Sequence, residues 1–267
     1  MSSARAWLAL ARWRNAALAA GGVVAAAWWS SSRVDTRVAL VALAAIALTA
    51  LANTVNDLAD VEIDRVAHPD RPLPSRAIAA STAVWFAVAC GVLSVILLAL
   101  ANLGLSLLTL PVIGLMCAYS TWFKRRGVPG NLLVALLASL PFFYGAWVVG
   151  HPARGALLTM IALPLHFARE VAKDVDDVAG DMTSRRTLPV MHGVRRARYA
   201  AVAGVVVYTL AVALMAPAFP LFALLLVPTI FLAALAMRRL FDARDGSANL
   251  LKAAMALAIV ALIVSGR

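Results

Sequence analysis

The chain carries little charge for its size. Of its 267 residues, 14% are charged and 63% are hydrophobic, and the mean hydropathy is +0.87. A soluble domain is about one quarter charged and about half apolar. The composition therefore excludes an ordinary soluble domain and predicts an integral membrane protein.

Cysteine is scarce as well. Cys90 and Cys117 are the two cysteines of the chain, and both lie in apolar runs, where a thiol behaves as a small hydrophobic side chain. No disulfide framework is expected. No cleavable signal peptide is expected either, because the first apolar run, Ala16 to Trp29, is followed by further apolar runs rather than by a soluble domain.

Apolar runs long enough to cross a bilayer recur along the whole sequence. A spanning helix needs about 20 largely apolar residues. Nine such runs are centred near residues 23, 45, 88, 111, 139, 161, 207, 226 and 257. The sequence therefore predicts an all-α integral membrane protein with nine transmembrane helices, forming a single domain over residues 1–267.

The basic residues predict the orientation of these helices. With the N-terminus in the cytoplasm, nineteen of the 24 Lys and Arg residues fall on the cytoplasmic side and four on the opposite side. Lysine and arginine concentrate in the cytoplasmic loops of membrane proteins. The net charge of +11 is therefore explained by membrane orientation, and no nucleic-acid partner is expected.

The acidic residues gather in two segments, which together hold ten of the thirteen acids. The first segment contains Asp57, Asp60, Glu62, Asp64 and Asp70, and the second contains Glu170, Asp174, Asp176, Asp177 and Asp181. Both segments fall on the predicted cytoplasmic side.

The two segments repeat one spacing, at positions i, i+4, i+7 and i+11. The first set is Asn53, Asp57, Asp60 and Asp64, and the second set, offset by 117 residues, is Glu170, Asp174, Asp177 and Asp181. On an α-helix such positions lie within about 60° of one another. Each segment is therefore predicted to present a stripe of oxygen atoms along one helix face.

Such stripes favour a divalent cation, because like charges three and four residues apart on a helix repel one another. Carboxylate and amide oxygens without His or Cys suit Mg²⁺ better than Zn²⁺. Mg²⁺ is usually bound by a few carboxylates together with substrate phosphates. In a membrane enzyme, a polyprenyl diphosphate would satisfy both the cation and an apolar groove. The alternative is a solvated, charged loop face.

The motifs resemble those of a known family. The stretch "NDLADVEID" resembles the NDxxDxxxD motif of the UbiA superfamily of intramembrane prenyltransferases, and "REVAKDVDDVAGD" resembles its second aspartate-rich motif. The resemblance implies a ring of helices around a central cavity in the cell membrane. It also implies Mg²⁺-dependent transfer of a prenyl group from a polyprenyl diphosphate to a lipophilic acceptor, at the cytoplasmic face.

The resemblance also implies roles for individual residues. The ligands of the metal and the diphosphate would be Asn56, Asp60, Asp64, Asp177 and Asp181, with Asp57, Asp174 and Asn53 as metal or substrate ligands in support. Lys124, in "YSTWFKRRG", resembles the lysine of the family that contacts the diphosphate. With the four aspartates Asp60, Asp64, Asp177 and Asp181, it completes the expected catalytic set.

Several basic residues have two open interpretations. Lys124 and its neighbour Arg125 would contact the diphosphate or anchor the chain at the membrane surface. Arg71 follows the first motif and could fold back over the phosphates. Arg169 and Lys173 would bind an anionic acceptor or neutralise the second motif. The pair Arg14 and Asn15 would contact a substrate head group or act as an anchor.

The flanking stretches narrow the resemblance. "DRPLPSR" and "REVAKDVDDVAGDMTSRRTLPV" are similar to the geranylgeranylglycerol-phosphate geranylgeranyltransferases, which implies geranylgeranylglyceryl phosphate as the acceptor in ether-lipid synthesis. Three features depart from the pattern: Arg76 stands where glycine is common, His68 stands where asparagine is common, and "RWRN" lacks a proline. The identity of the acceptor therefore stays open, and an aromatic quinone precursor or a chlorin-type alcohol is the alternative. A carrier would place ionisable residues near the bilayer midplane, and the acids here lie at one face.

Overall fold

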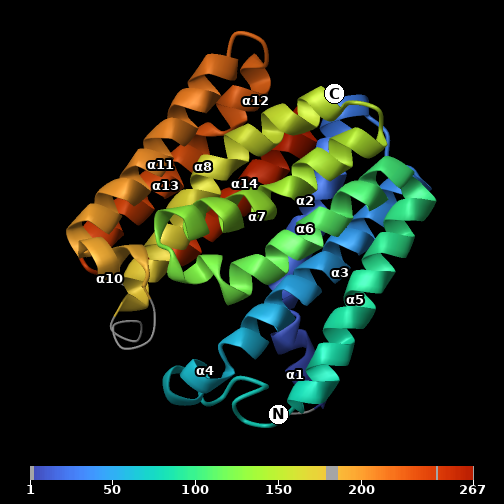
Figure 1. The fold of residues 1–267 in the computed structure, drawn as a ribbon. Helices are drawn as coiled ribbons and strands as arrows, with labels where there is room; N and C mark the ends of the chain where they lie inside the picture. Colours follow the sequence, from blue (N-terminus) through green and yellow to red (C-terminus); the bar gives the residue numbers. More distant parts are fainter. Residues whose placement is uncertain (1–2, 179–185, 245, 267) are drawn as a thin grey trace. The chain divides into compact units, whose positions relative to one another are not determined.

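The computed structural model describes residues 3–178, 186–244 and 246–266, which form helices joined by turns, with no strand among them (Figure 1). The chain divides into two compact units. The first unit contains Met1–Val24 and Val34–Trp122, and the second contains Ala25–Arg33 and Phe123–Arg267. Helix α2 (Trp13–Ser31) therefore contributes residues to both units.

The first unit is built on three long helices, α3 (Thr36–Ala59), α5 (Ala80–Ala101) and α6 (Leu103–Thr121), which pack on one another. Two shorter helices, α1 (Ser3–Leu10) and α4 (Val61–Ala67), complete it. Asp35 and Asn102 cap the N-termini of α3 and α6 by accepting hydrogen bonds from backbone N–H groups. Gly91 lets α5 approach α3 closely, because a Cβ there would lie 2.9 Å from a methyl carbon of Leu51.

In the second unit, α8 (Pro152–Asp176) packs against α7 (Val128–Val148), α11 (Val194–Met215) and α14 (Ser247–Ser265). The remaining elements are the turn η1 (Phe123–Arg125) and helices α10 (Leu188–His192), α12 (Pro220–Leu225) and α13 (Val227–Phe241). The run near residue 226 was expected as one helix, but it is divided at Leu226. Pro228 lies in the first turn of α13, where its missing N–H and its ring favour a new helix start.

Eight helical segments of the described chain are long and apolar enough to cross a membrane: α3, α5, α6, α7, α8, α11, the α12–α13 segment and α14. Eight of the nine predicted runs thus correspond to such segments. The first run forms α2, a helix of 19 residues that is not among the eight. The chain is a multi-pass membrane protein, and the nine-span count stays a prediction.

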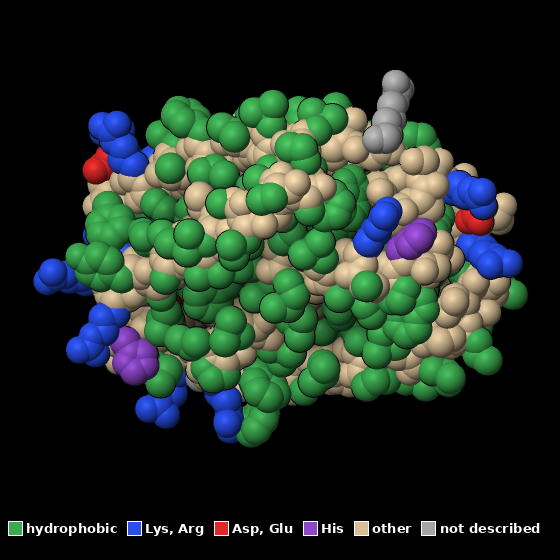
Figure 2. All heavy atoms as spheres, turned by 90° about the horizontal axis from the view of Figure 1, so that it is seen from above, with side chains coloured by type: hydrophobic (Ala, Val, Ile, Leu, Met, Phe, Trp, Pro, Cys, Tyr) green, Lys and Arg blue, Asp and Glu red, His purple; other side chains and the backbone are tan. Residues whose placement is uncertain are grey.

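The outward surface of these helices is apolar. Leu107, Leu110 and Leu214, for example, expose more than half of their area, and most side chains on the face in Figure 2 are hydrophobic. By contrast, many of the fully buried positions hold alanine, a small residue that lets helix backbones approach closely within a membrane. Lipid therefore takes the place of water around the spanning segments.

The segment from His68 to Ala79, which follows the first motif, is a series of turns rather than an open loop. Backbone hydrogen bonds run from Ser75 to the Arg71 carbonyl and from Ile78 to the Pro72 carbonyl. Arg76 has a φ of 58°, in the left-handed region where a side chain is strained and glycine is not. This explains why glycine would suit the position that the sequence fills with arginine.

We therefore expect Arg76→Gly to stabilise the protein by up to about 1 kcal/mol, since the left-handed conformation costs a side chain about 1–2 kcal/mol and the flexible glycine returns part of that. The check is the midpoint of heat inactivation in detergent. Arg76→Ala is the matched control and should give no gain, because alanine keeps the Cβ. Equal midpoints for the glycine and alanine variants would contradict the explanation.

Candidate functional site

The first motif lies where one helix ends and the next begins. Helix α3 ends at Ala59, and α4 starts at Val61. Asp60 joins them with φ −100° and ψ 2°, in the bridge region that many active-site residues occupy. The prediction that the four positions of the first set lie on one helix is therefore wrong, because the backbone changes conformation at Asp60 and divides them between α3 and α4.

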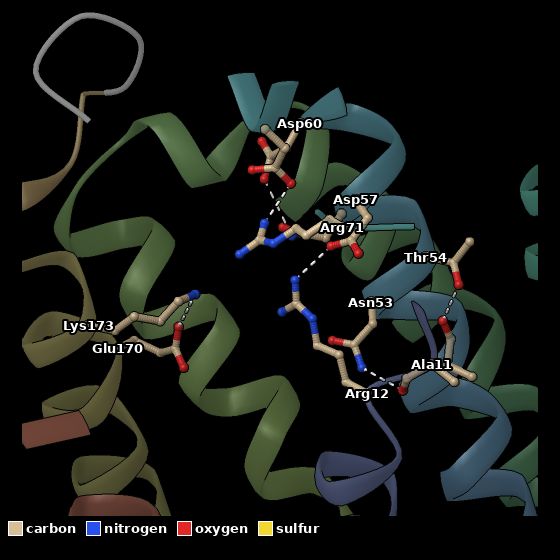
Figure 3. Close-up of polar contacts among 12 residues, drawn as sticks. Ala11, Arg12, Asn53, Thr54, Asp57, Asp60, Arg71, Glu170 and Lys173 are labelled. Atoms are coloured by element: carbon tan, nitrogen blue, oxygen red, sulfur yellow. Dashed lines mark hydrogen bonds and ion pairs between the residues drawn. The ribbon is translucent and has the colours of Figure 1, made fainter. Parts of the chain in front are cut away.

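Asn53 and Asp57 of α3 hold the break between α1 and α2 in place. The Asn53 amide donates a hydrogen bond to the Ala11 carbonyl at 3.2 Å, and Arg12 donates to Asp57 Oδ1 at 2.6 Å (Figure 3). Asn53 and Asp57 are one helical turn apart on α3. One face of α3 therefore contacts both Ala11 and Arg12, the two residues between α1 and α2. Arg12 itself has a φ of 48°, a strained conformation that this double attachment supports.

Two aspartates of the first motif are buried. The exposed fractions of Asp60 and Asp64 are 4% and 1%. Asp64 accepts a hydrogen bond from Arg71 at 2.5 Å through Oδ2, and Asn56 donates to Asp60 at 3.4 Å. The other oxygen of Asp64, Oδ1, is buried without a hydrogen-bond partner among the described residues. A buried, unsatisfied carboxylate oxygen is costly and is suited to a cation.

A cavity of about 350 Å³ adjoins the motif within the same unit. Arg12, Asp57 and Arg71 line it together with His68 and Asp70. The two arginines that pair with the first motif therefore face a space that a charged head group could enter.

The second motif occupies the end of α8 in the other unit. Asn131 of α7, which is 7% exposed, donates to Asp174 Oδ2 at 2.9 Å. Glu170 pairs with Arg169 at 2.5 Å and lies 3.8 Å from Lys173. Arg169 therefore pairs with a carboxylate of the motif through one guanidinium nitrogen, whereas its buried Nε has no hydrogen-bond partner among the described residues.

The two motifs share a backbone device. Asp177 ends α8 with φ −91° and ψ 1°, close to the angles of Asp60 at the end of α3. Each aspartate donates its N–H to the carbonyl four residues earlier, Asn56 and Lys173 respectively. Asp57 and Asp174 also correspond, since each accepts a hydrogen bond from a neighbouring segment. The pairs Asp57/Asp60 and Asp174/Asp177 of the repeated spacing therefore share a local structure.

Lys124 lies in the turn η1, directly after α6, and is half-buried. The first turn of α7 lies against this turn, because a Cβ on Gly130 would collide with the Phe123 carbonyl oxygen. Glycine is therefore required for the close contact that holds η1. The backbone of Arg125 belongs to the same turn, and Arg126 is exposed.

Other predicted residues have different surroundings. Arg14 is exposed and lies 5.5 Å from the ring of Trp13, and Asn15 is half-buried. Arg12, two residues earlier, pairs with Asp57 of the first motif. Asp181 lies outside the described residues.

Sequence reasoning missed Arg12 and Asn131. Arg12 could have been found as the first arginine of "RWRN", and Asn131 as a lone amide at the start of an apolar helix. A polar side chain in such a place usually requires a buried partner.

The donor set of the first motif fits a hard divalent cation. It offers carboxylate and amide oxygens, and one oxygen of Asp64 is buried without a hydrogen-bond partner among the described residues. No three His, Cys, Asp or Glu side chains converge on one point within the described ranges. A cation here would therefore need further oxygens from a ligand or water, which is how Mg²⁺ binds with phosphates.

Comparison with known proteins identifies one family and relatives within it. The model of the UbiA prenyltransferase family matches residues 17–261. The digeranylgeranylglyceryl phosphate synthase of Methanopyrus kandleri is 33% identical over 192 residues, covering 71% of this chain and 70% of that protein. The Thermococcus kodakarensis synthase is 35% identical over 161 residues, covering 60% of this chain and 58% of that protein.

Solved structures share the fold. A digeranylgeranylglyceryl phosphate synthase structure matches with a TM-score of 0.77 and 26% identity, covering 100% of this chain and 99% of that one. A UbiA homolog from Archaeoglobus fulgidus, bound to GPP and Mg²⁺, matches with a TM-score of 0.77 and 20% identity, covering 97% of this chain and 99% of that one.

Proposed function

The chain belongs to the UbiA prenyltransferase family, and from this premise we propose that it transfers a geranylgeranyl group from its diphosphate to geranylgeranylglyceryl phosphate, in a Mg²⁺-dependent step of ether-lipid synthesis. The observation that carries the proposal is the pair of aspartate motifs, each of which ends a long helix at an aspartate in the bridge conformation. Relatives named digeranylgeranylglyceryl phosphate synthase support the choice of acceptor.

In this reaction the allylic C–O bond of the donor breaks and the diphosphate leaves. The acceptor hydroxyl oxygen then bonds to the allylic carbon, and its proton passes to solvent. Negative charge develops on the departing diphosphate, so groups that stabilise this charge contribute most to the rate. Bound Mg²⁺ would supply that stabilisation.

The residues of the chain would hold this arrangement. Asn56, Asp60 and Asp64 of the first motif and Asp177 and Asp181 of the second would bind the cation, and the proposal is that the two motifs share one cation–diphosphate cluster. The buried, unpartnered oxygen of Asp64 and the Mg²⁺ bound by the Archaeoglobus fulgidus homolog support the choice of metal.

The basic side chains divide between donor and acceptor. Lys124 and Arg71 would contact the diphosphate, with Arg125 beside Lys124. Arg169 would bind the phosphate of the acceptor, because its buried Nε has no hydrogen-bond partner among the described residues, and Lys173 lies one turn further along the same helix. Arg14 and Asn15 would contact a substrate head group or anchor the chain at the membrane surface.

The test is mass spectrometry of the product formed by the purified chain from geranylgeranyl diphosphate and geranylgeranylglyceryl phosphate. The expected product is digeranylgeranylglyceryl phosphate, formed with Mg²⁺ and absent with a chelator. Transfer to an aromatic quinone precursor or a chlorin-type alcohol, without transfer to the glyceryl phosphate, would replace the proposed acceptor while keeping the enzyme class.

We further propose that the chain crosses the cell membrane nine times as one catalytic domain, with α2 as the first span, and that the N-terminus and both motifs face the cytoplasm. Cysteines introduced at Asp70, Arg126, Arg186 and Arg244 should then react with an impermeant reagent from the cytoplasmic side alone. A cysteine at Arg154 is the control and should react from the outside. Labelling of positions 70 and 186 from opposite sides would contradict this topology.

A further inference from the structure

The first unit contains a small hydrophobic cluster beside the first motif. Two of its buried residues, Ala6 and Leu10, come from α1, and two others, Leu73 and Ile78, come from the turn segment after the motif. Ala83 of α5 completes the buried set. Trp7 of α1 packs against Phe86 of α5, with ring centroids 5.0 Å apart. The cluster thus joins α1 to the turn segment.

Two residues of this cluster, Leu10 and Leu73, lie two positions along the chain from an arginine that pairs with the first motif. Leu10, which is fully buried, is two residues before Arg12, whose guanidinium pairs with Asp57. Leu73 is two residues after Arg71, whose guanidinium pairs with Asp64. The apolar contact and the two ion pairs are therefore tied together by very short stretches of backbone.

Helix α1 needs this contact in order to stay in place. It has eight residues, and helices shorter than about 12 residues are marginal on their own in water. Directly after α1, the Ala11 carbonyl accepts a hydrogen bond from Asn53 of α3, and Arg12 pairs with Asp57 of α3. Loss of the apolar contact would therefore loosen the hold of Arg12 on Asp57.

We propose that the cluster acts as a clasp, in which Leu10, Leu73 and Ile78 are positioning residues that set Arg12 and Arg71 on the first motif and thereby fix its carboxylates for the cation. The proposal rests on the proposed function, because it concerns the cation that the motif binds. Arg71 takes Oδ2 of Asp64 and leaves Oδ1 without a hydrogen-bond partner among the described residues. This division would leave one oxygen of the carboxylate to bind the cation.

The physical reason is the burial of these carboxylates. A buried carboxylate is costly without a partner, so Asp57 or Asp64 without its arginine would turn toward water and move its oxygens away from the cation. Groups that orient metal ligands contribute about 10- to 100-fold to metal affinity. The clasp is expected to act through these groups.

The experiment measures the binding of Mn²⁺, as a spectroscopic stand-in for Mg²⁺, to the full-length chain in detergent with inorganic diphosphate present. Leu10→Ala should raise the dissociation constant of Mn²⁺ by about 10-fold, and Leu10→Met should retain normal binding. Arg12→Ala should weaken binding similarly, and the double variant should be little worse than either, because residues that act through one another are not additive.

Two controls separate positioning from general loss of structure. Leu8→Ala changes an exposed leucine of α1 and should leave binding unchanged. Leu98→Ala removes a fully buried side chain of α5, fifteen residues along the helix from Ala83, or roughly 22 Å. It should lower the heat-inactivation midpoint without changing Mn²⁺ affinity.

The outcomes are distinct. Normal Mn²⁺ binding by Leu10→Ala, or equal weakening by Leu98→Ala, would overturn the clasp and leave the proposed function standing. Failure of the unaltered chain to bind Mn²⁺ with diphosphate would overturn the proposed function, and the clasp with it.

Discussion

Asp60→Ala and Asp177→Ala are each expected to lower prenyl transfer by about 100-fold or more, the loss that follows when one group stabilising a developing charge is removed. The two residues belong to different motifs, but both end a long helix in the same backbone conformation. If the motifs share one cation–diphosphate cluster, neither can stabilise the leaving group alone. The measurement is turnover with geranylgeranyl diphosphate at saturating acceptor.

The double variant tests the sharing directly. Residues that act as a unit are strongly non-additive, so the double variant should be little slower than either single variant. Asp176→Asn is the matched control, because Asp176 is exposed and lies outside the repeated spacing. Losses that multiply in the double variant would show that the motifs do not act on one cluster.

Asp64→Asn is expected to have the second large effect. The substitution keeps the shape of the side chain but removes its charge, and one of the two oxygens becomes an NH₂ group that cannot bind a cation. Because Asp64 is 1% exposed, water cannot easily replace it. Turnover should fall by about 100-fold, in the range seen when a single electrostatic contact to the transition state is lost, and added Mg²⁺ should restore only a small part.

Glu62→Gln provides the comparison within the same short helix. Glu62 pairs with Arg65 at 2.6 Å, and their side chains are 72% and 51% exposed. Surface pairs of this kind contribute about 0–1 kcal/mol to stability, and Glu62 lies outside the repeated spacing. Turnover of Glu62→Gln should therefore stay close to that of the unaltered chain. A similar loss in both variants would mean that overall negative charge, rather than the position of Asp64, matters.

Much of the fold could be predicted from the sequence because the signal for a spanning helix is local. The helix formed by a run such as α5 can be predicted without knowing which helices pack against it, because lipid requires a continuous apolar helix. Departures occur where a local signal is weak or interrupted. The apolar character of α2 is weakened by its Gly, Ser and Trp residues. Pro228 interrupts the run near residue 226.

The candidate site could be located from the sequence, but its partners could not be assigned. The repeated spacing identified both motifs, because it is written in a single stretch of chain. The ion pair of Arg12 with Asp57 joins residues 45 positions apart, and the bond from Asn131 to Asp174 spans 43. Helical periodicity carries no information about such pairs, which is why Arg12 was missed.

The spacing alone could not predict the backbone conformation at Asp60 either. Four polar positions at i, i+4, i+7 and i+11 fit one helix, and the break at Asp60 preserves the hydrogen bonds from Asp60 to Asn56 and from Asp64 to Asp60. The helix that starts after this break, α4, carries Asp64, which accepts a hydrogen bond from Arg71. The matching angles at Asp177 indicate that the break is part of the motif.

The most direct measurement is calorimetric binding of geranylgeranyl diphosphate to the full-length chain across a series of Mg²⁺ concentrations, for the unaltered chain, Asp60→Ala and Asp177→Ala. The account predicts binding that requires Mg²⁺ in the unaltered chain and is weakened by at least about 10-fold in each variant, with helical content unchanged. Binding that persists in a chelator, or normal Mg²⁺-dependent binding by Asp177→Ala, would contradict a shared cation–diphosphate site.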